Sequence, residues 1–246
     1  MRYSVRRATA VIADSVSTKN DLIELLAVPE ERINVVPLAA TLKKPENFQD
    51  VLKKYGLGRP YILFIGTLEP RKNLVRLVNA FGCLRKSGQS GIDLVITGKP
   101  GWGGEDLQNL VREHGIVDVV HFLDYMDQVE LAALLAGATL LAMPSLYEGF
   151  GLPLVDAMRF GVPILTSDRS SMPEVTGEAA VYVNPYEVDS IFKGMQQVLT
   201  DNRLREQLVQ AGYRQAEQFS WRRAARASEQ VFQQAVSAGW TMAEVD

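Results

Sequence analysis

The sequence alternates between short, continuous apolar runs and longer segments with helical periodicity, and this alternation restricts the fold more than any other feature. The apolar runs occupy residues 10–13, 33–36, 61–65, 93–97, 119–122, 139–143, 162–166 and 180–183. The helical segments occupy residues 18–26, 74–86, 104–114, 127–136, 152–160 and 188–199. Continuous apolar runs are typical of strands covered on both faces, as in a parallel sheet. The pattern predicts an α/β fold with a doubly wound, mostly parallel, Rossmann-like sheet.

The two ends of the chain depart from this alternation. Residues 204–235 are nearly all helical in pattern, apart from a break at 219–221 (FSW), where Ser220 fits an N-cap. The start holds two apolar runs and one helical segment, followed by the polar stretch 41–50, which has the composition of a linker. We therefore expect residues 1–40 to be the remnant of another domain, 41–218 to be the main domain, and 219–246 to be a final helix and tail.

Composition excludes several classes of protein. Hydrophobic residues make up 47% of the 246 positions, which predicts a sizeable core, and a net charge of -3 gives no reason to expect a nucleic-acid partner. The single cysteine, Cys83, excludes an internal disulfide and favours a reducing, cytoplasmic compartment. We expect Cys83 and His121 to be packing residues. With His114 as the only other histidine, a Cys/His zinc site is nearly excluded.

The apolar stretch 131–143 is shorter than the roughly 20 residues that a membrane-spanning helix needs. It reads better as a helix followed by a buried strand. We therefore expect at most peripheral contact with a membrane.

The first informative turn is 66–73 (GTLEPRKN), which follows one apolar run and precedes a helix. Gly66 permits a close approach of the backbone at the end of the strand. Arg71 and Lys72 lie where the helix begins, and cations there oppose the helix dipole unless an anion binds. The turn is either a diphosphate site or a solvated basic turn, and these residues alone do not decide between the two.

The second turn is 144–153 (PSLYEGFGLP), again between an apolar run and a helix. Gly149 and Gly151 leave backbone N–H groups accessible to a ligand. Glu148 and Asp156 are separated by seven residues, and carboxylates accept hydrogen bonds from sugar and ribose hydroxyls. Alternatively, the acids complement the dipole of the following helix, which explains Asp156 but not the glycines.

A third turn, 98–104 (GKPGWGG), follows the apolar run 93–97. It lacks the spacing of a P-loop. It is either one wall of a pocket, beginning at Gly98, or a flexible turn.

Together, GTLEPRKN at 66–73 and PSLYEGFGLPLVDAM at 144–158 resemble the retaining glycosyltransferases of family 4. The resemblance extends from Ala10 over essentially the rest of the chain. It implies a GT-B fold, in which two Rossmann-like domains enclose the active site, and transfer of a sugar from a nucleotide-diphosphate sugar. It further implies that this chain is the donor-binding domain with a remnant of the N-terminal acceptor domain. A weak likeness to mannosyltransferases favours GDP-mannose over UDP-sugars as the donor.

By position, the resemblance implies that Arg71 and Lys72 bind the donor diphosphate and that Glu148 approaches the transferred sugar. Asp156 stands where the family has a ribose-binding glutamate, and Thr67 stands where many relatives have arginine. The segment 120–125 matches the place where relatives hold the base. The predicted catalytic residues are Arg71, Lys72 and Glu148. The predicted substrate-binding residues are Gly66, Thr67, Arg71, Lys72, Gly98, Phe122, Leu123, Glu148, Gly149, Phe150, Gly151, Leu152 and Asp156.

No metal or other cofactor is expected, because two cations and a helix N-terminus can stabilise the leaving diphosphate. One alternative is a non-catalytic module that binds a nucleotide sugar. A nucleotide-sugar epimerase or dehydrogenase is disfavoured, because no Gly-x-Gly-x-x-Gly follows the first strand. Without its N-terminal domain, the chain is expected to transfer little sugar. It is also expected to self-associate through an apolar patch near Val11, Ile12, Trp221 and Phe232.

Overall fold

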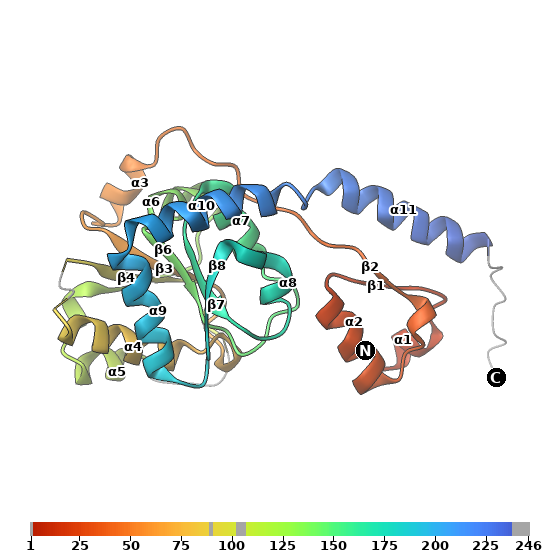
Figure 1. The fold of residues 1–246 in the computed structure, drawn as a ribbon, viewed down its shortest axis with the longest axis horizontal. Coiled ribbons are helices and arrows are strands. Elements are labelled where there is room, and N and C mark those ends of the chain that lie inside the picture. The colour runs from red at the N-terminus through yellow and green to blue at the C-terminus, as the bar shows by residue number, and fades with distance from the viewer. Residues whose placement is uncertain (1, 89–90, 102–106, 238–246) are drawn as a thin grey trace.

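The protein consists of a large α/β unit and a small unit beside it (Figure 1). The structure is a computed structural model that describes residues 2–88, 91–101 and 107–237. The large unit contains a six-stranded sheet with the order β5-β4-β3-β6-β7-β8. Its strands are β3 (Tyr61–Ile65), β4 (Asp93–Thr97), β5 (Val120–Leu123), β6 (Leu140–Met143), β7 (Ile164–Ser167) and β8 (Ala180–Val183). Every pair of neighbours is parallel, which confirms the predicted fold class.

Helices cover both faces of this sheet. One face carries α4 (Leu74–Lys86), α5 (Leu107–Glu113) and α9 (Val188–Thr200), and the other carries α3 (Gln49–Lys54), α6 (Gln128–Gly137) and α7 (Leu152–Phe160). The helix α10 (Asn202–Ala216) packs on α7 and α9, and the short α8 (Met172–Thr176) follows β7. Strands covered on both faces must be apolar throughout, and all five residues of β3 are buried. The main core therefore lies on both sides of the sheet.

The predicted element boundaries agree with the structure except at short elements. The strand predicted at 162–166 begins at Ile164, because Pro163 has no N–H to donate to a ladder. The helices α1 (Arg2–Arg7), α3 and α8 were not predicted, and α3 overlaps the stretch that was expected to be a linker. For the helix predicted at 104–114, the described residues contain α5 from Leu107 to Glu113, and the predicted start at 104 lies outside the described part of the chain.

The prediction for Cys83 is wrong, because this residue is exposed on α4. The helix buries Leu77, Phe81 and Leu84, and Cys83 points away from them. His121 is partly exposed on β5, and its Nε2 lies 2.9 Å from Asp93 Oδ2.

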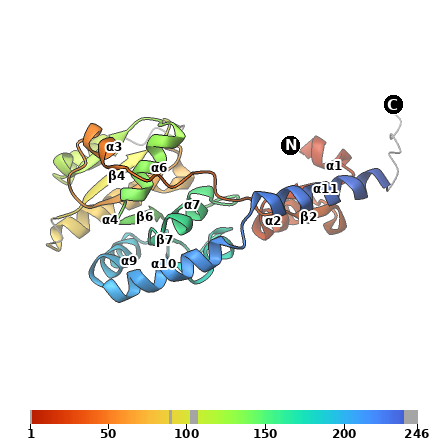
Figure 2. The same ribbon diagram turned by 90° about the horizontal axis from the view of Figure 1, so that it is seen from above.

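The small unit comprises α1 (Arg2–Arg7), β1 (Val11–Ala13), α2 (Val16–Leu26) and β2 (Ile33–Val35). The two strands pair in parallel, and a small apolar cluster, separate from the main core, lies beneath them. The helix α11 (Trp221–Ser237) lies over this unit in both views (Figures 1 and 2) and buries Ala224 and Val231. Of the residues predicted to form an apolar patch, Ile12, Trp221 and Phe232 are exposed, whereas Val11 is partly buried against the small apolar cluster.

The chain passes between the two units twice. The first crossing is residues 36–42 and the second is residues 217–221 (Figure 2). The indole Nε1 of Trp221 donates a hydrogen bond to the Ala40 carbonyl oxygen at 2.9 Å, so the two crossings are tied together. Ser220 Oγ accepts from Arg223 N at 3.3 Å and caps α11. The domain boundaries expected after residues 40 and 218 lie within the two crossings.

Candidate functional site

The first two turns lie side by side because the strands that precede them, β3 and β6, are parallel neighbours. Parallel strands end at the same edge of a sheet, where ligands bind in folds of this class. The turns are joined directly, since Leu146 N donates to the Arg71 carbonyl oxygen at 2.7 Å. We call residues 144–151 the glycine-rich loop.

Asn73 fixes the start of α4 against this loop. Its backbone is left-handed, with φ 62°, a conformation that asparagine tolerates better than most residues. Its buried side-chain amide donates to the carbonyl oxygens of Pro144 at 2.9 Å and Pro185 at 2.7 Å. Arg71 and Lys72 consequently lie in a 3-10 turn (Pro70–Lys72) just before α4 rather than in its first turn. The sequence interpretation did not single out Asn73, although it closes the GTLEPRKN motif.

The three predicted catalytic residues meet in one ion cluster. Lys72 Nζ lies 2.6 Å from Glu148 Oε1, and Arg71 Nη1 lies 2.9 Å from Glu148 Oε2. Ser145 Oγ donates to Glu148 Oε1 at 2.7 Å. Lys72 and Glu148 are 7% and 4% exposed, so each needs a partner to stay charged. The Arg71 side chain is more exposed and also pairs with Glu69 at 2.6 Å, which leaves it accessible to a ligand.

Gly66 is required beside this cluster. A Cβ at Gly66 would lie 3.3 Å from Lys72 Cε and would be strained at a φ of +155°. The glycine therefore lets the lysine side chain pass the end of β3 on its way to Glu148.

Serine hydroxyls donate hydrogen bonds to carbonyl oxygens of the glycine-rich loop. Ser171 Oγ donates to the Glu148 carbonyl at 3.0 Å, and Ser170 Oγ donates to the same oxygen. Ser15 Oγ, from the small unit, donates to the Gly149 carbonyl at 2.6 Å. The buried ring of Phe150 packs edge-on against Phe219, with ring centroids 5.6 Å apart.

The N–H groups where the glycine-rich loop meets α7 are unused. Within the described part of the chain, the N–H groups of Phe150, Gly151 and Leu152 make no hydrogen bond. They stand at the N-terminus of α7, whose N-cap is Gly151 with φ 95°. Free N–H groups at a helix N-terminus attract anions. The position predicted to contact sugar and phosphate therefore presents the donors that such contacts need.

Asp156 does not join this cluster. It is 3% exposed, and its Oδ1 accepts from Thr41 N at 2.7 Å and from Leu42 N at 2.9 Å. Its Oδ2 accepts from Thr41 Oγ1 at 3.0 Å. Burial raises the pKa of Asp156 above its ordinary value, although the hydrogen bonds from Leu42 and Thr41 oppose this. In the structure, the Asp156 carboxylate thus binds the first crossing. Its contact with ribose stays a prediction.

A cavity of about 330 Å³ opens at the ends of β3 and β4. The predicted residues Gly66, Thr67 and Gly98 line it. A Cβ at Gly98 would lie 1.9 Å from the Gly66 carbonyl oxygen, so only glycine allows the two strand ends to approach this closely. The remaining residues that line the cavity are Ile65, Thr97, Lys99, Tyr125, Met126 and Leu131.

The sequence interpretation missed several residues of this cavity. Phe122 and Leu123 were predicted to contact substrate, but they belong to β5 and are not among the lining residues. Tyr125 lies just beyond that strand, and Lys99 Nζ stands 4.4 Å from its ring centroid. Tyr125 is the last residue of the segment 120–125, which the resemblance matched to the base-binding position, and it alone of that segment lines the cavity. The third turn continues into residues 102–106, outside the described part of the chain.

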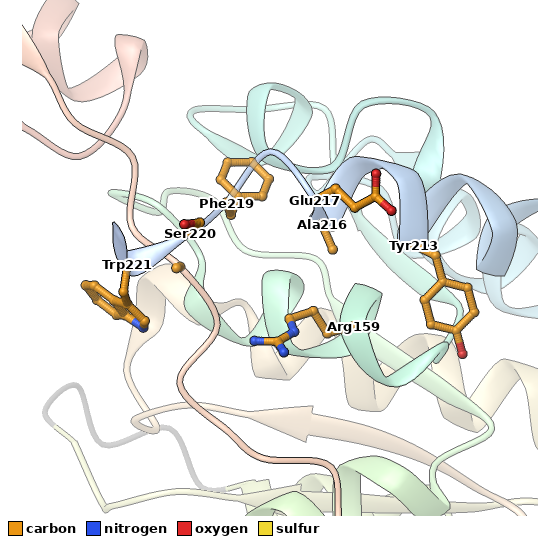
Figure 3. A pocket seen from close by; sticks show the side chains of 8 residues that line it. Arg159, Tyr213, Ala216, Glu217, Phe219, Ser220 and Trp221 are labelled. Atoms are coloured by element: carbon orange, nitrogen blue, oxygen red, sulfur yellow. The ribbon is translucent and has the colours of Figure 1, made fainter. Parts of the chain in front are cut away.

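A second cavity, of about 540 Å³, lies beside the second crossing (Figure 3). Arg159 of α7 and Trp221 of α11 face it from opposite sides. It is at the end of α7 remote from Gly151, so it is separate from the ion cluster. Ala39, Tyr213, Ala216, Glu217, Phe219 and Ser220 complete its lining.

No metal centre or membrane span is found in the residues that the structure describes. No three side chains of the His, Cys, Asp or Glu types stand close enough together there to hold an ion. No helix there combines the length and apolar character needed to cross a bilayer.

Comparison with known proteins shows the family. Residues 45–215 match the family model described as glycosyl transferases group 1. The chain is 35% identical over 226 residues to an O-antigen chain mannosyltransferase B of Escherichia coli, covering 90% of this chain and 59% of that protein. It is 34% identical over 237 residues to an MMP alpha-(1->4)-mannosyltransferase of Mycolicibacterium hassiacum, covering 94% of this chain and 56% of that protein.

Solved glycosyltransferase structures share the fold. Sucrose-phosphate synthase from Thermosynechococcus elongatus superimposes with a TM-score of 0.82 at 23% identity, over 97% of this chain and 61% of that one. Anabaena Alr3699/HepE, solved in complex with UDP and glucose, superimposes with a TM-score of 0.81 at 19% identity, over 95% of this chain and 64% of that one. The chain thus spans about three-fifths of the length of these proteins. On the match over residues 45–215 and the identity to the curated relatives, the chain belongs to the glycosyl transferases group 1 family.

Proposed function

We propose that the protein transfers a sugar from a nucleotide-diphosphate sugar to an acceptor with retention of anomeric configuration, and that this chain is mainly the donor-binding part. The ion cluster beside the free N–H groups of α7 carries the proposal. Arg71 and Lys72 share one carboxylate, so a diphosphate can take over part of their charge without leaving a buried cation unpaired. The names of the curated relatives support transfer of a hexose.

The chemistry follows from the charge that develops on the leaving group. As the glycosidic bond breaks, negative charge grows on the nucleoside diphosphate. Two cations and the N–H groups of Phe150, Gly151 and Leu152 are fixed before reaction, and donors arranged in advance stabilise such charge most effectively. In this proposal Glu148 orients the cations and approaches the transferred sugar. No protein nucleophile is assigned.

The proposed donor is GDP-mannose, with a UDP-sugar as the second choice. The relatives named as mannosyltransferases favour mannose. The neighbour solved with UDP and glucose keeps the uridine donor in consideration. The proposal places the protein in the cytoplasm, at most peripherally on a membrane, and needs no metal.

Isothermal titration calorimetry tests the donor site. The isolated chain should release or absorb heat with one of UDP, GDP, ADP or their sugars at millimolar concentration, and the affinity should fall as salt is raised, because phosphate contacts are charge-assisted. The corresponding nucleosides are the control. An absence of binding to every nucleotide and nucleotide sugar would overturn the proposal.

A non-catalytic binding module is the alternative. It predicts the same binding but no transfer when the chain is joined to the rest of its N-terminal domain. A transfer assay on that longer protein separates the two, with product analysis by NMR to establish the anomeric configuration.

A further inference from the structure

The two units touch through polar groups gathered at the first turn of α2. We call residues 15–18 the α2 turn. Val16 N donates to both carboxylate oxygens of Glu174, at 2.9 and 3.0 Å, and Ser17 N donates to Glu174 Oε2 at 3.3 Å. Glu174 lies on α8 of the large unit, 158 residues away in sequence. Its carboxylate therefore satisfies N–H groups that the first turn of any helix leaves free, and it complements the helix dipole.

The same turn reaches the glycine-rich loop. Ser15 Oγ and Thr18 Oγ1 both point their hydroxyls at the Gly149 carbonyl oxygen, at 2.6 and 3.3 Å. Tyr147 OH donates to Asp21 Oδ2 at 2.6 Å, one turn further along α2. Burial raises the pKa of Tyr147 to about 12, and the bond to Asp21 adds to the rise, so the phenol remains a donor at neutral pH. Two sites of contact thus hold α2 to the loop.

These polar contacts are not supported by a shared core. The apolar cluster of the small unit and that of the large unit have no member in common. Interfaces between domains that lack a large apolar contact permit relative motion. The orientation of the α2 turn therefore depends on a small number of hydrogen bonds, and the carboxylates of Glu174 and Asp21 accept the charge-assisted ones.

The Gly149 carbonyl controls the direction of a ligand-facing group. A peptide unit is planar and trans, so the oxygen of Gly149 and the N–H of Phe150 point in opposite directions from one rigid plane. When Ser15 and Thr18 hold the oxygen, the Phe150 N–H is aimed away from the α2 turn. That N–H is one of the free donors at the start of α7.

We propose that Glu174 is a positioning residue, which fastens the α2 turn to the large unit so that Ser15 and Thr18 can aim the Phe150 N–H at the donor. The inference rests on the proposed function for the identity of the ligand, but the contact itself does not. It gives the small unit, on the acceptor side, a direct influence on how tightly the donor's anionic part is bound.

The test compares Glu174→Ala with Glu178→Ala. Glu178 is also exposed, lies four residues further along and carries the same charge, and its side chain makes no hydrogen bond among the described residues. Spin labels on the native Cys83 and on Leu25→Cys, both exposed, report the distance between the units by pulsed electron paramagnetic resonance. Amide exchange at Val16 and Ser17 reports the contact directly.

Glu174→Ala should broaden the distance distribution and speed exchange of the Val16 and Ser17 amides by roughly five- to tenfold, the usual effect of losing a cap. Glu174→Gln, which keeps one acceptor oxygen, should restore part of both signals. Affinity for the best-binding nucleoside diphosphate should fall several-fold in Glu174→Ala and remain unchanged for its nucleoside. Glu178→Ala should leave every readout unchanged.

Two results would overturn the inference. One is a distance distribution and exchange rates in Glu174→Ala equal to those of the control. The other is an opened contact with unchanged diphosphate affinity. If no nucleotide binds even the unmodified chain, the proposed function fails, and with it the inferred aiming of Phe150, whereas the distance and exchange data still decide the contact made by Glu174.

Discussion

Replacement of Asp156 separates the effect of its shape from the effect of its charge. Both backbone donors, Thr41 N and Leu42 N, bond to the same oxygen, Oδ1. Asparagine can keep a carbonyl oxygen at this position and place its amide at Oδ2, where the Thr41 hydroxyl can turn to accept instead of donating. Alanine removes both oxygens. We therefore expect Asp156→Asn to be tolerated and Asp156→Ala to be destabilising.

The magnitudes follow from the burial of each donor. Leu42 N–H is buried, and leaving it without an acceptor costs about 1–3 kcal/mol. Thr41 N–H is only partly buried and can turn to water, so its loss costs about 0.5–1.5 kcal/mol. Asp156→Ala should thus lower the free energy of unfolding by about 2–4 kcal/mol. Asp156→Asn should change it by less than about 1 kcal/mol, because it removes a charge that burial already disfavours.

The pH dependence gives an independent check. The folded-state pKa of Asp156 lies above its ordinary value of 3.8, so the folded protein binds more protons than the unfolded chain as the pH rises from 3.8 to the raised value. Over this window Asp156 lowers the stability as the pH rises. The Asp156→Asn variant lacks this contribution and should gain stability relative to the unmodified protein as the pH rises.

Urea denaturation followed by circular dichroism, at several pH values from 4 upward, measures these differences. Asp118→Asn, at an exposed aspartate, is the matched control. If Asp156→Asn is as destabilising as Asp156→Ala at neutral pH, the charge is essential. The argument that one oxygen, Oδ1, serves both backbone donors and suffices for stability is then refuted.

Three further predictions concern binding and association. Lys72→Ala should weaken binding of a nucleoside diphosphate by about 1.5–3 kcal/mol and leave binding of the nucleoside nearly unchanged. Calorimetry measures both affinities, with the exposed Lys86→Ala as control. Equal losses for the two ligands would show that Lys72 has a structural role instead. If Asp156 also contacts ribose, Asp156→Asn should lower affinity for ribonucleotides more than for deoxyribonucleotides, and identical losses would leave it only its contact with the first crossing. The chain should self-associate in light scattering, and Phe232→Ser, at a side chain that is 62% exposed, should reduce this; a strictly monomeric protein contradicts it.

The sequence pattern was most informative where burial is complete. The boundaries of β3 and β4 were predicted to the residue, because all five positions of each strand are buried and both ends carry turn residues. The short helices α1, α3 and α8 were missed, since five or six residues are too few to show a helical period. The exposed face of α4 was misjudged at Cys83 because residue type, rather than its place on the helix, guided the prediction.

The site was predictable as far as it depends on strand order. Arg71, Lys72 and Glu148 follow neighbouring parallel strands, so their meeting follows from the α/β pattern and the two motifs. The partners of Asp156 and Glu174 were not predictable, because they depend on the path of the first crossing and on the placement of the small unit. Those contacts join residues more than 100 positions apart and leave no local signal.

The double passage of the chain between the units has a consequence for recombination among relatives. The small unit and α11, which lies over it, come from opposite ends of the chain, with the whole large unit between them in sequence. A chimera made at one splice point would therefore place α11 of one parent beside the small unit of another, with the buried Ala224 and Val231 in foreign surroundings. Exchange of the small unit together with α11 needs two junctions, one in each crossing. A single proteolytic cut in the first crossing separates the small unit from the large unit, which keeps α11, whereas a cut in the second crossing releases α11 and leaves the small unit attached.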